Sequence, residues 1–273
     1  MSAPTESRVF STYSSQADRY DDRAHEGTCW GAHTQWIIDS IHPPAWARTI
    51  ADLGCGTGAQ LRSLADRTDK SIKLFGVEPA DNMRAHAISR NADLSNVEVR
   101  AGSFEAMPLE DRSIDYMYSI NAFHWASDPT QGLIEMDRVM RRPGRMEHCF
   151  IGRDIGREFI RATSPIFMKY MGPKKLLAAA TMRFQFTRGE AEAFFAGRFG
   201  RKRVEASEVY KVYHDSVENH LIWWVRIEPQ LLDIPEDKKE ACFTEVKRAL
   251  AKLDTGKGVP YTMHQLRVKV TLD

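Results

Sequence analysis

Hydrophobic positions between Thr49 and Cys149 form short apolar runs that alternate with amphipathic stretches. In one such stretch Leu133, Met136 and Met140 recur at three- and four-residue spacing, which is the period of a helix. Alternating strands and helices indicate βαβ units and a parallel sheet. Right-handed crossovers at each helix then give a doubly wound sheet. The predicted strands are residues 49–53, 73–78, 97–102, 114–119 and 145–150.

The flanking residues have a mostly helical pattern. Residues before the first strand read as helices that end at Pro43 and Pro44. After residue 150, helical stretches precede a strand at 202–213, further helices and a last strand at 261–272. Alternation in that last strand indicates an edge or antiparallel position. We therefore predict a doubly wound, Rossmann-like α/β fold with a seven-stranded, mostly parallel sheet and a helical cap. The expected divisions are an N-terminal helical lid (1–47), a cofactor-binding core (48–150) and a cap with the last two strands (151–273).

Composition narrows the class of partner. Thirty-eight basic and 37 acidic residues leave a net charge of +1, so no overall field attracts nucleic acid or an anionic membrane. No apolar run approaches the roughly 20 residues that cross a bilayer, and the first residues lack an apolar signal core. Four scattered cysteines without a CxxC pair indicate reduced thiols. We expect a cytoplasmic protein with a small-molecule substrate and no nucleic-acid or membrane partner. The sequence is compatible with a homodimer.

The stretch ADLGCGTGAQ, residues 51–60, lies between the first predicted strand and a helix. Gly54, Gly56 and Ala59 satisfy the GxGxx(G/A) pattern of dinucleotide-binding loops, whereas Gly54, Gly56 and Gly58 satisfy a tighter one. Asp52 precedes the first glycine by two residues, where its charge would repel a pyrophosphate and attract a positive amino or sulfonium group. The loop therefore favours a cationic cofactor over a dinucleotide.

Glu78 ends the second predicted strand, about 20 residues after the last glycine. A carboxylate at this position suits the two hydroxyls of a ribose. Dinucleotides and other nucleoside cofactors share a ribose, so Glu78 does not discriminate between them. An NAD(P)-dependent oxidoreductase is the alternative on a related sheet, and a non-catalytic cofactor-binding protein is a third.

Four motifs follow one another along the chain: DLGCGTG, GVEPADNMRAHA, GSFEAMPLEDRSIDYMYSINAFHW and EMDRVMRRPGR. In this order they resemble the motifs of class I S-adenosylmethionine-dependent methyltransferases. The nearest subgroup is that of trans-aconitate-methyltransferase-like and ubiquinone-biosynthesis-like enzymes of small molecules. The resemblance covers residues 10–150 and implies methyl transfer from S-adenosylmethionine.

The resemblance also implies which residues meet the cofactor. The glycine turn would contact the methionine part, with Asp52 near its amino group, and Glu78 would hold the ribose. Met83 would pack on the adenine, and Asn121 would line the sulfonium region. Ser103 and Phe104 stand where the family often has an acidic and a small residue. The full implied set is Tyr20, Asp52, Gly54, Cys55, Gly56, Gly58, Glu78, Pro79, Met83, Ser103, Phe104 and Asn121.

Methyl transfer is an in-line displacement, which needs a base only when the acceptor must lose a proton. His124 follows the fourth strand and is the candidate base or orienting residue; a structural hydrogen bond to the cap is the alternative. Trp125 is either a pocket wall or a packing aromatic. His25 and His33 are candidates to face the substrate. Glycines interrupt the helix that would align them with Cys29, so no metal site is expected.

The acceptor class follows from the predicted cap, whose apolar content favours a small hydrophobic or aromatic metabolite over a polyanion. Oxygen, nitrogen and carbon acceptors all stay open, because the fold alone does not choose between them. The cap residues behind this expectation are Phe159, Phe167, Met168, Phe194, Trp223 and Trp224.

Overall fold

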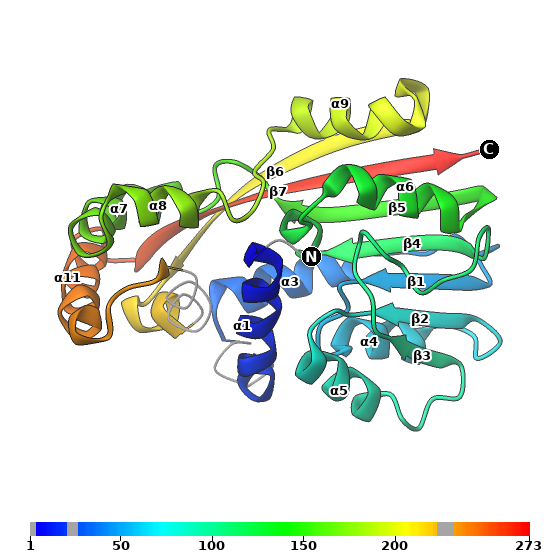
Figure 1. The fold of residues 1–273 in the computed structure, drawn as a ribbon, viewed down its shortest axis with the longest axis horizontal. Coiled ribbons are helices and arrows are strands. Elements are labelled where there is room, and N and C mark those ends of the chain that lie inside the picture. The colour runs from blue at the N-terminus through cyan, green and yellow to red at the C-terminus, as the bar shows by residue number, and fades with distance from the viewer. Residues whose placement is uncertain (1–3, 21–26, 223–231) are drawn as a thin grey trace.

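The computed structural model describes residues 4–20, 27–222 and 232–273. Its centre is a seven-stranded sheet in the order β3-β2-β1-β4-β5-β7-β6 (Figure 1). Strands β1 to β5 pair in parallel, and β7 runs antiparallel between β5 and β6. The predicted α/β fold with a mostly parallel sheet is confirmed. The strands are β1 Thr49–Leu53, β2 Lys73–Val77, β3 Val97–Arg100, β4 Ile114–Ile120, β5 Met140–Ile151, β6 Val204–Asp215 and β7 Val259–Leu272.

Helices connect and flank these strands. The α-helices are α1 Pro4–Tyr20, α3 Cys29–Asp39, α4 Ala59–Arg67, α5 Asp81–Arg90, α6 Pro129–Val139, α7 Arg157–Met171, α8 Pro173–Ala180, α9 Arg188–Phe199 and α11 Lys239–Ala251. The 3-10 helices are η1 Phe123–Trp125, η2 Arg201–Arg203 and η3 Glu236–Lys238. No described helix is long and apolar enough to cross a membrane.

The predicted strands agree with the structure to within two residues at most ends, and β5 is the main difference. It begins at Met140, five residues before the predicted start at 145. Gly144, in the early part of β5, pairs with Leu272 of β7. This early part of β5 is therefore already a strand of the sheet. The register between β4 and β5 also shifts near Ile114, which an apolar pattern does not reveal.

The central strands of the sheet are buried on both faces, whereas the edge strand β6 is largely exposed. One apolar layer joins β1 and β4 to α3 and α4 through residues such as Ile37, Ile50 and Leu61. The opposite layer joins the sheet to α6 and α9 through residues such as Met136 and Phe195. Parallel strands covered on both faces are the arrangement that βαβ crossovers produce.

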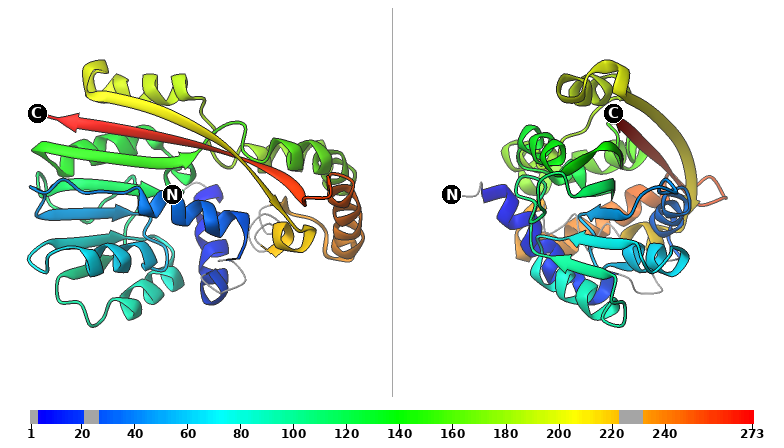
Figure 2. Two further views of the ribbon diagram at one scale, coloured as in Figure 1. Left: turned by 180° about the vertical axis from the view of Figure 1, so that it is seen from behind. Right: turned by 90° about the vertical axis from the view of Figure 1, so that its right-hand side faces the viewer.

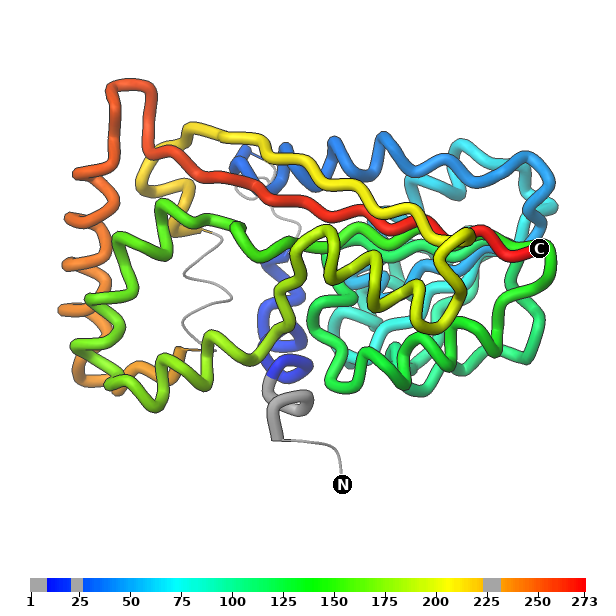
Figure 3. Tube along the Cα trace, turned by 90° about the horizontal axis from the view of Figure 1, so that it is seen from above, coloured from blue at the N-terminus to red at the C-terminus, as the bar shows by residue number. Residues whose placement is uncertain are grey.

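A second apolar core lies at the far end of β6 and β7. These two strands run on past the others, and α7, α8 and α11 gather around their extension (Figures 2 and 3). Phe159, Val246 and Tyr261 are among its buried residues. The helices α7, α8 and α11, called the cap below, are therefore carried by two long strands beyond the carboxyl ends of β1, β2 and β4.

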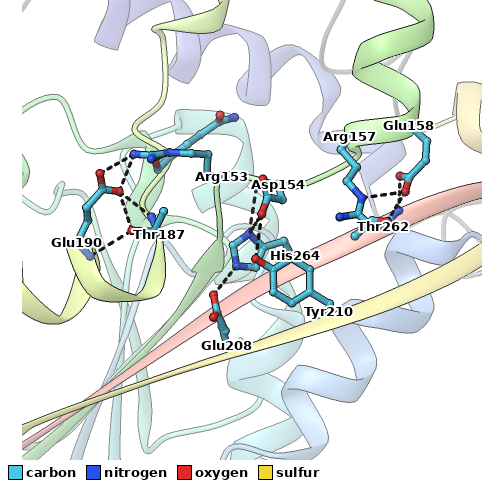
Figure 4. A network of polar contacts seen from close by, with 11 residues as sticks. Arg153, Asp154, Arg157, Glu158, Thr187, Glu190, Glu208, Tyr210, Thr262 and His264 are labelled. Carbon is cyan, nitrogen blue, oxygen red and sulfur yellow. Dashed lines mark hydrogen bonds and ion pairs between the residues drawn. The ribbon is translucent and has the colours of Figure 1, made fainter.

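Polar contacts attach the turn between β5 and α7 to the long strands (Figure 4). The Asp154 backbone N–H donates to His264 Nδ1 at 3.0 Å, and His264 Nε2 lies 3.1 Å from Glu208 Oε2. The Tyr210 ring stacks on His264, and its hydroxyl donates to Asp154 Oδ2 at 2.9 Å. Thr262 donates its backbone N–H to Glu158 of α7 at 3.1 Å. These bonds fix where α7 leaves the sheet.

Candidate functional site

A cleft of about 750 Å³, counted with the solvent space at its mouth, lies at the carboxyl ends of β1, β2, β3 and β4. In a doubly wound sheet this edge is where ligands bind. Helix α1 forms the outer wall and η1 one side. The lining residues are Val9, Phe10, Tyr13, Tyr20, Leu53, Gly54, Gly56, Val77, Glu78, Pro79, Ala80, Met83, Gly102, Ser103, Phe104, Glu105, Ile120, Asn121, Ala122, Trp125 and Ala126.

Two glycines keep the floor of this cleft open. Gly54 has φ +70°, and a Cβ there would lie 2.4 Å from Ala122 Cβ. Gly56 has φ +56°, and nothing lies within 4 Å of the position a Cβ would take. A left-handed backbone of this kind favours glycine. The turn therefore leaves its backbone bare toward the cleft, as a closely approaching ligand requires.

Glu78 connects this turn to the end of β2. Its Oε2 accepts a hydrogen bond from the Gly56 backbone N–H at 2.9 Å, and its Oε1 accepts one from the Ala80 N–H at 2.9 Å. Burial raises the pKa of Glu78, and these two bonds partly offset the rise. The carboxylate is thus oriented at the cleft wall by backbone on both sides.

Asp52 lies directly before the turn and is 2% exposed. Its Oδ2 has no hydrogen-bond partner among the described residues. Burial raises the pKa of Asp52 to about 7, the Tyr118 hydroxyl lowers it and the charge of Glu78 raises it. An unpartnered buried carboxylate is costly, and a neighbouring cation would relieve that cost.

These features test whether S-adenosylmethionine fits the cleft. Bare turn backbone suits the close approach of the methionine part, and Asp52 has an unsatisfied oxygen for an ammonium group. Glu78 offers a carboxylate to the ribose, and Met83 and Phe104 offer apolar surface for the adenine. Asn121 has φ +52°, and its buried Oδ1 is unpartnered within the described ranges. The residues present therefore fit this cofactor.

An aromatic wall faces the turn from α1 and η1. The ring of Tyr13 contacts Trp125 edge-on at 6.1 Å and Tyr20 at 6.1 Å between centroids. Helix α1 is held against α5 because the Asn82 backbone N–H donates to Ser14 Oγ at 3.0 Å. The wall lines the outer part of the cleft with aromatic rings.

His124 lies behind this wall rather than on it. It is 3% exposed and is not among the residues that line the cleft. Burial lowers its pKa well below the usual value, and the charge of Arg183 adds to this effect. Its Nδ1 has no partner in the part of the chain that the structure describes. His124 is therefore neutral at pH 7, with a ring nitrogen still able to form a hydrogen bond.

The site residues predicted from the sequence, apart from His124, fall into three groups by their position relative to the cleft. Nine of the twelve implied cofactor residues line the cleft, together with Trp125. Asp52, Cys55 and Gly58 lie just behind it, and Gly58 packs closely against Ala87 of α5. His33 is elsewhere, with its ring nitrogens 3.2 Å from the Tyr213 hydroxyl and from Gln265 Oε1.

Three residues named from the sequence, His25, Trp223 and Trp224, lie outside the described residues. Among the residues that the structure describes, no group of three or more histidine, cysteine, aspartate or glutamate side chains could hold a metal ion. Sequence reasoning did not single out the apolar residues of α1 that line the cleft, Val9, Phe10 and Tyr13. Their apolar spacing was the available signal.

Comparison with known proteins gives one family match. Residues 51–147 match the family described as a methyltransferase domain. An uncharacterised methyltransferase of Mycobacterium tuberculosis is 32% identical over 44% of this chain and 44% of its own length. Dimethylglycine N-methyltransferase of Parasynechococcus marenigrum is 28% identical over 43% of this chain and 41% of its own length. The chain thus spans less than half the length of these relatives.

The fold also has solved counterparts. A putative methyltransferase from an antibiotic biosynthesis pathway of Anabaena variabilis superposes with a TM-score of 0.60 at 19% identity, covering 92% of this chain and all of its own. At this identity the likeness concerns the fold alone. The matched residues 51–147 include the glycine turn, Glu78 and Asn121, which are the parts of the cleft built by the sheet.

Proposed function

We propose that this protein, whose residues 51–147 match a methyltransferase domain, is a class I S-adenosylmethionine-dependent methyltransferase that methylates a small hydrophobic or aromatic metabolite. The observation that carries the proposal is the bond between the Gly56 N–H and Glu78, beside Asp52, whose Oδ2 has no hydrogen-bond partner in the described part of the chain. This arrangement offers one carboxylate to a ribose and another to a cation. The comparisons give an NAD(P)-dependent oxidoreductase no support.

When bound, S-adenosylmethionine supplies an electrophilic methyl group on a positively charged sulfur. The residues of the chain contribute position and a dry surrounding. The glycine turn and Glu78 would fix the cofactor, while the wall of Phe10, Tyr13 and Trp125 would exclude water from the acceptor. Holding two reactants at attack distance in a dry pocket supplies much of the acceleration of a displacement.

His124 is proposed as the base or as the residue that orients the acceptor. Its neutral imidazole is the form that accepts a proton, and its Nδ1, which has no partner among the residues described, is available for a hydrogen bond. Trp125, the next residue, lines the cleft, and the two rings lie 5.1 Å apart. The proposed role requires His124 to reach the acceptor from its position behind Trp125.

The acceptor class is argued from the walls of the cleft. Their outer part comes from α1 and η1 and is mostly aromatic or aliphatic, whereas the acidic residues Glu78 and Glu105 are held by backbone N–H groups. Such a surface favours an apolar acceptor over a polyanion. One relative is named as an N-methyltransferase of dimethylglycine. The lining of the cleft does not select the acceptor atom, so the proposal includes oxygen, nitrogen and carbon acceptors.

Within the family, we place the protein in the small-molecule subgroup that resembles trans-aconitate and ubiquinone-biosynthesis methyltransferases. The order of its four motifs supports this assignment. A cytoplasmic location is proposed with it, because all four cysteines are free and buried, as reducing conditions favour.

Calorimetric titration with S-adenosylhomocysteine and, separately, NADPH tests the cofactor. We expect saturable 1:1 binding of S-adenosylhomocysteine and no heat with NADPH; the opposite result would overturn the proposal. Incubation of the protein with methyl-labelled S-adenosylmethionine and a metabolite extract then identifies the acceptor. Label is expected in one organic-soluble product, and its amount should fall strongly at subsaturating cofactor when the Glu78→Ala variant replaces the protein.

A further inference from the structure

A buried acid and a buried phenol lie side by side beneath the glycine turn. Asp52 of β1 and Tyr118 of β4 are partners in the parallel register. Both residues are almost inaccessible to solvent: the exposed fraction is 2% for Asp52 and 1% for Tyr118. Asp52 Oδ2 and Tyr118 Oη each lack a hydrogen-bond partner among residues 4–20, 27–222 and 232–273. Two unsatisfied polar atoms at one buried position are costly, which indicates a role beyond packing.

The two groups already act on each other. The Tyr118 hydroxyl lowers the pKa of Asp52, against the larger rise caused by burial. Burial and then the charge of Asp52 raise the pKa of Tyr118 well above its usual value. Tyr118 therefore keeps its proton at any pH near neutrality. The hydroxyl is close enough to influence the carboxyl group, but in this structure its geometry falls short of a hydrogen bond.

The remaining neighbours of Asp52 oppose its charge or leave it unchanged. Glu78, at the end of β2, raises its pKa. Cys55, in the turn, has its own pKa raised by burial and by the charges of Asp52 and Glu78, so it stays a thiol. Arg84 of α5 acts on Cys55 and Glu78. Helices α3 and α4 contribute apolar residues such as Ile37 and Leu61 to this layer.

We propose that Tyr118 is a positioning residue for Asp52, whose ionised carboxylate accepts a hydrogen bond from its hydroxyl and is thereby held ready for a cationic ligand at the glycine turn. The inference rests on the proposed function, because the cation in question is the ammonium group of the bound cofactor. The adjustment that the bond requires is local, since the two residues are register partners and share one buried face of the sheet. Tyr118 itself does not line the cleft.

The proposal requires cofactor affinity to depend on pH through Asp52. A cation binds the ionised carboxylate, so affinity falls about tenfold for each pH unit below the pKa of that group. Loss of the Tyr118 hydroxyl removes the neighbour that favours ionisation. The midpoint of the affinity profile should then move to higher pH, while affinity well above the midpoint changes little.

The chain offers a matched control in Tyr116. This residue lies two positions earlier on β4, is fully buried, and its ring is 6.2 Å from that of Tyr118. Its hydroxyl donates to Glu147 Oε2 at 3.1 Å rather than facing Asp52. Tyr116→Phe therefore removes a buried hydroxyl from the same strand without touching the proposed pair.

The experiment is calorimetric titration of S-adenosylhomocysteine into the wild type, Tyr118→Phe and Tyr116→Phe from pH 6 to pH 9. For a midpoint shift of about one unit, Tyr118→Phe should bind about tenfold more weakly at pH 6 and within about threefold of wild type at pH 9. Tyr116→Phe should keep the wild-type midpoint. Titration of the ligand's own amino group affects all three proteins equally and cancels in the comparison.

An unchanged midpoint in folded Tyr118→Phe overturns the proposal, as does an equal shift in Tyr116→Phe. If Tyr118→Phe does not fold, site-specific 3,5-difluorotyrosine at position 118 keeps the shape of the side chain and makes its hydroxyl a stronger donor. The midpoint should then move to lower pH, and no movement is a refutation. Failure of the proposed function is separate, since the wild type itself would then not bind S-adenosylhomocysteine.

Discussion

The backbone N–H of Gly56 donates a hydrogen bond to Glu78 Oε2 at 2.9 Å, which joins the glycine turn of β1 to the end of β2. The other carboxylate oxygen of Glu78 is held by the Ala80 N–H. One side chain therefore sets the shape of the turn and presents charge to the cleft. This double role makes Glu78 the sharpest test of the cofactor site.

We expect Glu78→Ala to weaken S-adenosylhomocysteine binding at least tenfold, because hydrogen bonds to a charged group contribute about 1.5–3 kcal/mol. Calorimetric titration measures the change. Glu98→Ala is the control, since Glu98 is an exposed acidic residue of β3 that pairs with Arg100. Equal affinity in the two variants would remove Glu78 from the cofactor site.

Substitution of the two turn glycines should have different effects: loss of stability at Gly54 and loss of cofactor affinity at Gly56. At Gly54 an added Cβ would lie 2.4 Å from Ala122 Cβ, so Gly54→Ala should lower the melting temperature strongly. At Gly56 there is space, so Gly56→Ala costs only the left-handed backbone strain of about 1–2 kcal/mol. Its methyl group stands where a ligand would approach. We therefore expect a folded Gly56→Ala protein with at least tenfold weaker S-adenosylhomocysteine binding.

Gly200→Ala is the matched control for Gly56→Ala. Gly200 also has positive φ with nothing within 4 Å of a Cβ, and it lies in the turn after α9. Thermal unfolding should show a loss of stability in both variants, larger in Gly200→Ala, because φ 87° with ψ 139° places Gly200 outside the left-handed region that other residues adopt. Only Gly56→Ala should lose affinity, and retained affinity there would mean that the cofactor does not approach the turn.

Much of the cleft could be predicted from the sequence because it belongs to the sheet. The turn and Glu78 are fixed by short strands whose ends the apolar pattern shows, and parallel strands bring their carboxyl ends to one edge. The start of β5 at Met140 was not predictable in the same way. Met140 pairs with Ile114 of β4 and Gly144 pairs with Leu272 of β7, and local patterning carries no information about such distant partners.

The residues around the cleft show the same limit. Helix α1 reads as a helix, but which of its faces meets the sheet depends on contacts with α5 such as that of Ser14 with Asn82. The sequence makes His33 a candidate to face the substrate, yet its ring nitrogens contact Tyr213 and Gln265 on the long strands. Burial of His124 behind Trp125 is likewise a tertiary effect.

His124→Ala should lower turnover and leave S-adenosylhomocysteine affinity within about threefold of wild type. The reason is that His124 is proposed to act on the acceptor and does not line the cleft. A general base contributes about 10²–10⁴-fold to rate, so a loss of at least about 100-fold is expected if His124 serves as one. The assay is release of S-adenosylhomocysteine with the identified acceptor.

His33→Gln serves as the control for His124→Ala, because it alters another buried histidine that is away from the cleft. Both variants are to be assayed at a temperature where circular dichroism shows each to be folded. Unchanged turnover in His124→Ala would leave His124 with a structural role only.

Burial of His148 should make the free energy of unfolding depend on pH. It is fully buried on β5 between the rings of Phe123 and Phe195, and neither ring nitrogen has a hydrogen-bond partner among the residues described. Burial lowers its pKa to about 3. In the unfolded chain the pKa is about 6.5, so below that pH the unfolded state binds a proton that the folded state does not. The contribution to stability is present above pH 6.5 and is lost as the pH falls toward 3.

One such group lowers the free energy of unfolding by about 2 kcal/mol between pH 7 and pH 5. We expect His148→Phe, which removes the titrating ring but keeps an aromatic side chain, to reduce the loss by that amount. Urea unfolding at the two pH values measures it. His42→Phe is the control, because His42 is exposed and its replacement should leave the loss as in wild type. A full wild-type loss in His148→Phe would show that other groups cause the acid sensitivity.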